Sequence, residues 1–212
     1  MSADSTPADR SADRPRTGKP APYHHGDLRR ALTDAALDLI GERGPKGFTL
    51  TEVARRAGVS TAAPYRHFTD KADLLATVAE LGFQRLHDAL RTAPDGHDSR
   101  DRLIELGRAY LRWALEHPSF YLVMFGSEVK GADHPGLDRA FEAAFGTLLE
   151  AVDAARSDGT LQNRDANAMA GSLWALVHGV ASLDIGGDLH THIEATSEDL
   201  VVQTVTALTA PR

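Results

Sequence analysis

Residues 48–71 constrain the fold of this chain more than any other stretch, because they have the pattern of two short helices joined by a tight turn. Thr49 and Glu52 have the spacing of a capping box, in which each residue satisfies a backbone N–H of the other at the start of a helix. Gly58 is expected to end this first helix, since a left-handed turn residue costs least as glycine. Val53 and Ala57 fall on its apolar face.

A second short helix is expected over 61–68, capped by Ser60 or Thr61. Two short helices around a glycine-containing turn form a helix-turn-helix, and the second helix of that motif enters the major groove of DNA. Pro64 falls in the first turn, where proline is tolerated because the N–H groups there lack helical partners. Phe68 is expected to be a core residue.

The letters of this stretch resemble one family closely. Thr51-Glu-Val-Ala-Arg-Arg-Ala-Gly-Val-Ser60, then Tyr65-Arg-His-Phe68, Asp70-Lys71 and Leu74-Leu75 resemble the TetR/AcrR family of bacterial transcriptional regulators, in order and spacing over about 27–90. The resemblance implies an N-terminal DNA-binding domain followed by a helical domain that binds a small effector and forms a homodimer. Pro64 departs from the common family pattern, which has Leu or Ile there.

The rest of the chain has apolar residues at helical spacing and no convincing strand. We expect an all-α fold of about nine helices, with a disordered N-terminal arm (1–22), a helix-turn-helix domain with a linking helix (23–91) and a helical effector and dimerisation domain (92–212). Besides the two short helices, the expected helices cover about 27–43, 70–91, 99–117, 119–125, 136–157, 165–183 and 197–208. Loops are expected over 126–135 and 186–196.

The charges are divided unevenly along the chain, whose net charge is −7. Residues 1–91 are mildly basic, with fourteen basic and twelve acidic residues, whereas 92–212 have nine basic and eighteen acidic residues. DNA binding depends on the local field rather than on the total, so the acidic total does not exclude it. Without cysteine there are no disulfides or thiolate metal sites. We also expect no signal peptide, no membrane segment and a cytoplasmic location.

The polar first 22 residues have no periodicity and are expected to be disordered. Their basic residues either touch DNA phosphates or the minor groove, or belong to a solvated tail, and the composition favours the tail. These basic residues are Arg10, Arg14, Arg16 and Lys19.

Seven residues are expected to contact DNA: Thr51, Thr61, Ala62, Tyr65, Arg66, His67 and Lys71. The first residues of a recognition helix meet base edges and later ones meet the backbone. By resemblance, Tyr65 and His67 match the phosphate-contacting pair of the family. Packing on the first helix is the alternative for Tyr65, and simple surface charge is the alternative for Lys71.

Trp174, His178 and Gly179 resemble the Trp-His-Gly signature of one subgroup of TetR-like C-terminal domains. Trp174 and His178 lie one turn apart on one helix face. They either line an effector pocket or are ordinary core residues, and pockets are mostly apolar with few polar groups. The candidate pocket residues are Tyr110, Trp113, Phe120, Tyr121, Met124, Phe141, Phe145, Trp174 and His178.

The helices expected over 165–183 and 197–208 carry more apolar surface than a chain-terminal pair needs. By resemblance, these two helices form a four-helix interface with the same helices of a second copy. A dimer also fits a palindromic operator, which needs two recognition helices about 34–36 Å apart. The alternative is that both helices belong to the core of a monomer.

The resemblance therefore implies a repressor that a small, largely apolar effector releases from a DNA operator, with no cofactor. A regulator that activates or senses no ligand stays open. An enzyme is disfavoured, because catalytic motifs are absent and His178 with Asp184 is the nearest acid–base pair. A metal-responsive regulator would use His190, His192 and Asp188, although neighbouring polar residues of a loop are usually solvated.

Overall fold

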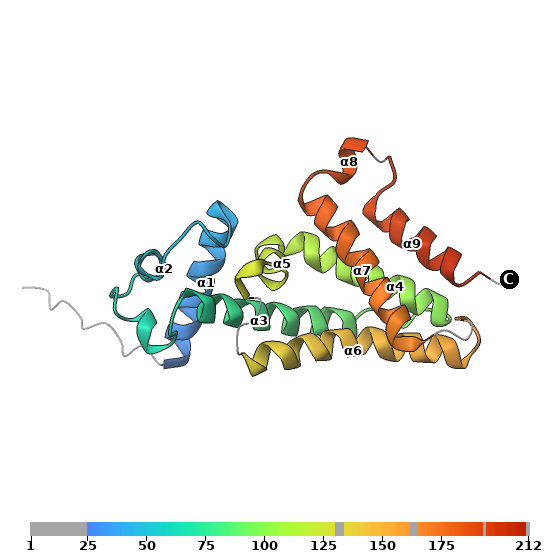
Figure 1. Ribbon diagram of the computed structural model, residues 1–212, viewed down its shortest axis with the longest axis horizontal. Helices are drawn as coiled ribbons and strands as arrows, with labels where there is room; N and C mark the ends of the chain where they lie inside the picture. Colours follow the sequence, from blue (N-terminus) through green and yellow to red (C-terminus); the bar gives the residue numbers. More distant parts are fainter. Residues whose placement is uncertain (1–24, 130–133, 162–164, 193, 211–212) are drawn as a thin grey trace, which may run out of the picture.

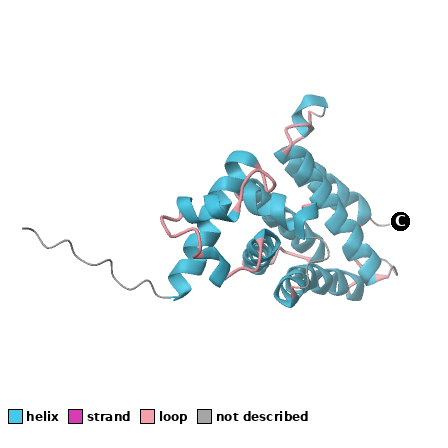
Figure 2. Cartoon of the chain, turned by 60° about the vertical axis from the view of Figure 1, so that its left-hand side comes forward, coloured by secondary structure: helices cyan, strands magenta, loops and turns pink. Residues whose placement is uncertain are grey.

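The computed structural model describes residues 25–129, 134–161, 165–192 and 194–210. Every regular element in these ranges is a helix, so the all-α expectation is confirmed (Figures 1 and 2). The elements are α1 (His25–Arg43), α2 (Leu50–Arg56), η1 (Pro64–Arg66), α3 (Lys71–Arg91), α4 (Ser99–Glu116), α5 (Pro118–Met124), η2 (Ser127–Val129), α6 (Pro135–Ser157), α7 (Ala166–Ile185), α8 (Leu189–His192) and α9 (Ser197–Leu208). The expected arm, 1–22, lies outside the described residues.

Helices α3, α4 and α6 run along the long axis of the molecule, and α7 and α9 cross it obliquely (Figure 1). At one end, α1, α2 and η1 pack around the beginning of α3. Helix α4 returns along α3, and α6 then runs beside α3 in the same direction. At the other end, α7 and α9 lie against α4. Helix α3 therefore reaches from the small N-terminal unit into the larger helical unit.

The start of α2 is fixed by the capping box that the sequence predicts. The Glu52 amide donates to Thr49 Oγ1 at 3.3 Å, and the Thr49 amide donates to Glu52 Oε2 at 2.9 Å. Gly58 turns the chain with φ of +69°, which agrees with its predicted role. Hydrogen bonds to Thr49 hold the pKa of the Glu52 carboxyl below its usual range. The point at which α2 begins is therefore set by short-range contacts.

The expected α-helix over 61–68 is wrong: the structure has turns at 61–63 and the single 3₁₀ turn η1. Proline has no N–H, so Pro64 cannot donate the α-helical bond to the carbonyl of Ser60. The amide of Ala63 instead bonds the Ser60 carbonyl at 2.9 Å, and that of His67 bonds the Pro64 carbonyl at 2.9 Å. Both bonds span three residues, which is the tighter 3₁₀ pattern. We call residues 61–67 the recognition turn.

Two expected loops contain short helices. The turn η2 falls within the expected loop 126–135, and α8 within 186–196. Leu189, at the start of α8, is 1% exposed, so burial of this side chain anchors the extra turn.

The buried side chains form one continuous hydrophobic cluster from α1 to α9. Polar contacts also join the N-terminal unit and the beginning of α3 to later segments. Lys46 Nζ lies 3.1 Å from Glu128 Oε1, and His134 Nδ1 lies 3.4 Å from Glu80 Oε2. These contacts tie the α1–α2 turn to η2 and tie α3 to the residue that precedes α6.

Candidate functional site

The recognition turn presents a compact set of exposed side chains. Thr61, Ala62, Tyr65 and Arg66 are all exposed, and the ring of Tyr65 is 59% exposed. Packing against the first helix, the alternative for Tyr65, therefore does not account for the position of this ring. The side chain beneath them is Phe68, which is 1% exposed and makes the turn part of the core, as the sequence predicts. The turn can thus offer polar and apolar groups to a partner without unfolding.

His67 and Thr51 occupy less open positions than the four exposed residues of the turn. His67 is half-buried and borders a groove between α1 and α3, together with Arg29 and Arg30. Thr51 is half-buried in the first turn of α2. Their contacts with DNA stay a prediction.

Lys71 is turned toward its own protein. Its ammonium group donates to the carbonyls of Phe48 at 2.7 Å and Lys46 at 3.2 Å, and lies 4.2 Å from the centre of the Phe48 ring. Partial burial lowers the pKa of Lys71. Two of its three N–H groups are thus used to hold the α1–α2 turn against α3, which leaves one for a phosphate. The alternative of a simple surface charge does not describe this residue.

Arg55 is a basic residue outside the predicted DNA-binding set. It is exposed at the end of α2 and forms no ion pair with a described residue, whereas its neighbour Arg56 pairs with Glu42 at 2.8 Å. The sequence signal for Arg55 is its position in the last turn of the helix that precedes the recognition turn. Arg55 therefore adds a positive charge beside that turn.

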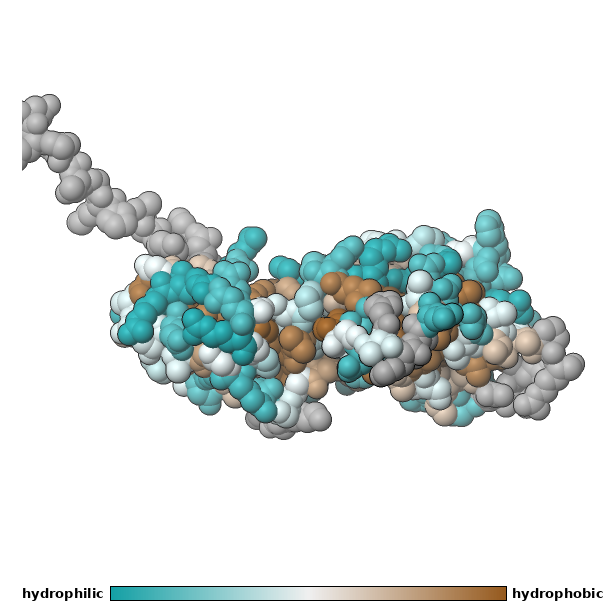
Figure 3. All heavy atoms as spheres, turned by 90° about the horizontal axis from the view of Figure 1, so that it is seen from above, coloured by the Kyte–Doolittle hydropathy of each residue, from teal (hydrophilic) through white to brown (hydrophobic). Residues whose placement is uncertain are grey.

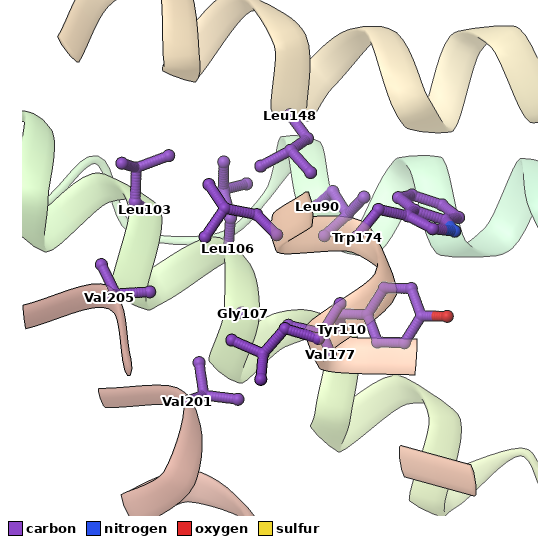
Figure 4. Close-up of a pocket in the computed structure, with 12 residues that line it drawn as sticks. Leu90, Leu103, Leu106, Gly107, Tyr110, Leu148, Trp174, Val177, Val201 and Val205 are labelled. Atoms are coloured by element: carbon purple, nitrogen blue, oxygen red, sulfur yellow. The ribbon is translucent and has the colours of Figure 1, made fainter. Parts of the chain in front are cut away.

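The larger unit contains a narrow apolar cavity, which we call the core slot. It lies between α4, α7 and α9, with Leu90 of α3 and Leu148 of α6 completing its wall (Figure 4). The space not filled by atoms is about 400 Å³, its mouth included. Most of it is too narrow for a water molecule, so a ligand must part the helices to enter.

Of the nine predicted pocket residues, Tyr110 and Trp174 line the core slot. Phe141 and Phe145 pack behind it, each with its ring centre 5.7 Å from that of Trp174. The other five belong to neighbouring parts of the core: Trp113, Phe120, Tyr121, Met124 and His178. The slot is mostly aliphatic, and its aliphatic residues were not in the predicted set.

Tyr121 and His178 form a polar pair beside the slot. Tyr121 Oη lies 2.8 Å from both the Nδ1 atom and the backbone carbonyl oxygen of His178. The carbonyl can only accept, so Tyr121 donates its one proton there and Nδ1–H must donate to Tyr121. This assigns the ring proton to Nδ1 and leaves Nε2 as an acceptor. Burial lowers the pKa of His178, which keeps the ring neutral.

The hydroxyl of Tyr110 is buried beside that of Tyr121. The residue is 2% exposed, and its hydroxyl interacts with the Tyr121 hydroxyl. Burial raises the pKa of Tyr110 above its usual range and that of Tyr121 to about 12, so both stay neutral.

Burial lowers the pKa of His178 in the folded state, so below about pH 6.5 the unfolded state binds a proton more readily than the folded state does. The free energy of unfolding should therefore fall as the pH is lowered past about 6.5. In urea unfolding at a series of pH values, His178→Gln should lose stability less steeply below that pH than the wild type. His97→Gln, at an exposed histidine, is the control and should keep the wild-type slope. Equal slopes for all three proteins would contradict this prediction.

Helix α7 is exposed far more than a core helix. No Asp, Glu, Lys or Arg lies between Asp165 and Asp184. By length and composition alone this helix could cross a membrane. Within the protein, 33% of its most apolar stretch is buried. Figure 3, viewed from the side of α8, shows hydrophobic side chains at the surface in the middle of the molecule and a largely hydrophilic N-terminal unit.

The residues of the two rival sites have other partners or lie outside the described side chains. His178 bonds Tyr121, while Asp184 accepts a hydrogen bond from Ser197, so the two do not form an acid–base pair. The side chains of His190 and His192 lie outside the described part. Among the described residues, no three His, Asp or Glu residues are grouped closely enough to hold a metal ion.

Two family profiles match the chain. Residues 32–78 match the profile described as bacterial regulatory proteins of the tetR family, and residues 103–208 match that of the tetracyclin repressor-like C-terminal domain. The matched segments contain the recognition turn and the core slot, respectively.

Individual relatives agree with these profiles. The HTH-type transcriptional regulator BetI of Rhizobium meliloti is 39% identical over 85 residues, 40% of this chain and 42% of the relative. The chain thus spans about two fifths of the length of the BetI relatives it matches. An HTH-type transcriptional regulator of Mycobacterium bovis is 28% identical over 64% of this chain and 62% of its own length.

Solved structures extend the likeness to nearly the whole chain. A protein of unknown function from Rhodococcus sp. RHA1 is 33% identical, with a TM-score of 0.75 over 89% of this chain and 96% of its own. The TetR family transcriptional regulator PfmR of Thermus thermophilus is 16% identical, with a TM-score of 0.66 over 84% of this chain and 96% of its own. At 16% identity, PfmR shows the shared fold alone.

Proposed function

The chain belongs to the TetR family of bacterial transcriptional regulators, and from that premise we propose that it is a cytoplasmic repressor that a small, largely apolar effector releases from a palindromic operator. The observation that carries this proposal is the recognition turn. Its exposed Thr61, Ala62, Tyr65 and Arg66 stand on a rigid base formed by Phe68 and the capped α2. Such a surface can enter a major groove, with Arg66 on bases or phosphate and Tyr65 on phosphate.

The chain divides by function near the end of α3. Residues 23–91 are the DNA-binding part with its linking helix, and 92–212 bind the effector and the second subunit. The two parts differ in function but are not separately packed, because the hydrophobic cluster is continuous across the boundary. Continuity favours transmission of a ligand signal along α3 and α6.

The active form is a homodimer joined through α7 and α9. The exposed face of α7 is uncharged and includes small residues, and added Cβ atoms at Gly171 and Gly179 would meet nothing within 4 Å. Packing inside the subunit therefore does not require glycine at these positions. A partner helix approaching closely does benefit from them, since the side chains at a helix contact set the distance between the axes. A second copy would also cover the apolar surface of α7.

Release follows from ligand entry into the core slot. Leu90, near the end of α3, is part of the slot wall, so parting the helices must move α3 or its neighbours. The ligand acts only through its differential affinity for the two arrangements of the dimer. A coupling of about 1–3 kcal/mol is ordinary for such a response.

The first test is binding of the purified protein to the DNA upstream of its own gene, across a salt series. Arg66→Ala should weaken sequence-dependent binding about tenfold and reduce the salt slope by about one, and Tyr65→Phe should weaken it less. Arg139→Ala, at an exposed arginine of α6, is the control. Unchanged affinity and salt slope in both recognition-turn variants would remove these residues from the interface.

The same assay separates a repressor from the alternatives. A ligand that lowers operator affinity supports effector release. Sequence-dependent binding that is indifferent to every ligand shown to bind would favour the ligand-independent regulator. Increased transcription from the bound promoter would favour an activator.

A further inference from the structure

The groove between α1 and α3, which His67 borders, is a second hollow that is separate from the core slot, and we call it the α1–α3 groove. It lies where α1 packs on the beginning of α3 (Figure 1). The space not filled by atoms is about 1580 Å³, its mouth included. Much of this space is wide enough for water, so a ligand can enter without parting any helices.

Arg29 holds a positive charge at one end of the groove. Its guanidinium donates to Thr77 Oγ1 at 3.0 Å and lies 5.4 Å from the ring centre of the buried Phe68. It forms no ion pair with a carboxylate in the described part of the chain. A guanidinium has five N–H donors, so most of them remain for a ligand. The charge of Arg29 is therefore positioned but not neutralised.

Arg85 lines the groove further along α3. Its guanidinium lies 4.8 Å from the ring centre of Phe120, a buried residue of α5. Stacking on a ring uses the flat face of a guanidinium and leaves the N–H groups at its edge available. Within the described ranges, Arg85 has neither a carboxylate nor another hydrogen-bond acceptor as a partner. This second charge is thus also held in place without an anion.

The spacing of the two arginines determines the length of a ligand that can bind both. Arg85 is eight residues beyond Thr77, to which Arg29 is bonded, so the two anchor points are about 12 Å apart along α3. Leu81 lies midway between them and lines the groove. Carboxylate and phosphate groups are the bidentate partners of guanidinium. A fitting molecule therefore has an anion at each end and an uncharged middle.

Two carboxylates also line the groove, but each has a partner of its own. Asp34 Oδ2 lies 3.8 Å from Arg30 Nε. Glu80 Oε1 accepts a hydrogen bond from Gln84 at 3.1 Å, and Glu80 Oε2 lies 3.4 Å from His134 Nδ1. Three arginines line the groove against these two acids, so its excess charge is positive and attracts anions.

The position of Arg85 favours a small molecule over DNA as the occupant. Arg85 is about 21 Å along the helix from Lys71, the first residue of α3 after the recognition turn. A DNA strand seated on the recognition turn meets the beginning of α3. A molecule of about 12 Å, in contrast, spans the two anchor points.

We propose that the α1–α3 groove binds a small, elongated dianion, with one carboxylate or phosphate group on Arg29, the other on Arg85 and an uncharged chain over Leu81. This site is distinct from the core slot and does not depend on effector release. A bound dianion would connect α1 of the N-terminal unit to the middle of α3. The protein would then have a ligand site beside its recognition turn.

The test is calorimetric titration of the full chain with alkanedioates of increasing length, and with a matched series of alkane bisphosphates. Decanedioate has the length that the anchor points require, whereas succinate is too short to reach both arginines. Decanedioate should therefore bind saturably and at least about tenfold more tightly than succinate. Added salt should weaken this binding, because the arginines are exposed and their charges are screened.

Matched variants assign the binding to the groove. Arg29→Gln and Arg85→Gln should each lower the affinity for decanedioate about tenfold, because each removes one of the two charged contacts. Arg112→Gln makes the same substitution at an exposed position of α4 outside the groove and should keep the wild-type affinity. All three arginines are exposed helical residues, so glutamine should leave the fold intact.

The proposal is overturned if neither series binds saturably, if succinate binds as tightly as decanedioate, or if either groove variant keeps the wild-type affinity. Operator binding by Arg85→Gln across a salt series tests DNA as the occupant. Unchanged operator affinity and salt slope would support the small-molecule site. A slope reduced by about one, without dianion binding to the wild type, would assign Arg85 to the DNA backbone and overturn the proposal.

Discussion

An Ala175→Glu variant should be monomeric and should lose at least about 100-fold in operator affinity, the largest effect that we expect from one surface substitution. Ala175 is exposed in the middle of α7, so glutamate there costs the isolated subunit little. In a dimer built on α7 and α9, the added carboxylate of each subunit would enter an apolar interface in which residues 166–183 have no Lys or Arg to pair with it. A buried carboxylate without a partner is costly. A monomer has one recognition turn and therefore contacts only half of the operator.

The measurement is sedimentation velocity together with operator binding. Ala143→Glu is the matched control, since it makes the same substitution at an exposed position of α6 and should leave a dimer with full affinity. A dimeric Ala175→Glu protein would place the subunit interface elsewhere. A monomeric variant with normal operator affinity would contradict the link between dimerisation and DNA binding.

A Phe68→Ala variant should lose about 3–5 kcal/mol of unfolding free energy, the usual cost of removing a large buried aromatic ring. Phe68 is 1% exposed, and the guanidinium of Arg29 lies 5.4 Å from its ring centre. Its loss removes the base of the recognition turn, so operator binding should also be lost. Urea unfolding followed by circular dichroism, with operator binding below the transition, measures both effects.

Tyr65→Ala provides the contrast, because it removes an aromatic ring of similar size from the same turn. This ring is exposed, so the change should alter stability by less than about 0.5 kcal/mol while weakening operator binding. If Phe68→Ala were as stable as Tyr65→Ala, the core position of Phe68 would be contradicted. Wild-type operator affinity in Phe68→Ala would show that the turn holds its shape without this ring.

Local chemistry could be predicted from the sequence wherever neighbouring residues decide it. The capping box of Thr49 and Glu52, the turn at Gly58 and the burial of Phe68 follow from spacing and residue type. The 3₁₀ form of the recognition turn differs from the prediction for a local reason. Proline is tolerated in a first helical turn, but the missing N–H of Pro64 prevents the α-helical bond to the Ser60 carbonyl.

Contacts between distant segments could not be predicted in this way. The sequence around Lys71 indicates a surface or phosphate-binding residue, and only the folded chain brings the carbonyls of Lys46 and Phe48 to its ammonium group. The position of the core slot likewise depends on how helices that are distant in the sequence pack against one another. Its walls include Val201 from α9 and Leu103 from α4, whereas the predicted set favoured aromatic residues, most of which fill the core.

The length of α3 determines how far the recognition turn moves for a given tilt of this helix. This helix has 21 residues and connects the wall of the core slot to the recognition turn. At about 1.5 Å per residue it is about 30 Å long, so a tilt of about 5° at the slot moves the far end by roughly 3 Å. Two subunits tilting in opposite senses would change the separation of their recognition turns by about 5 Å, against the roughly 34–36 Å that one DNA turn demands. A helix half as long would need twice the tilt, and a correspondingly larger ligand, to achieve the same release.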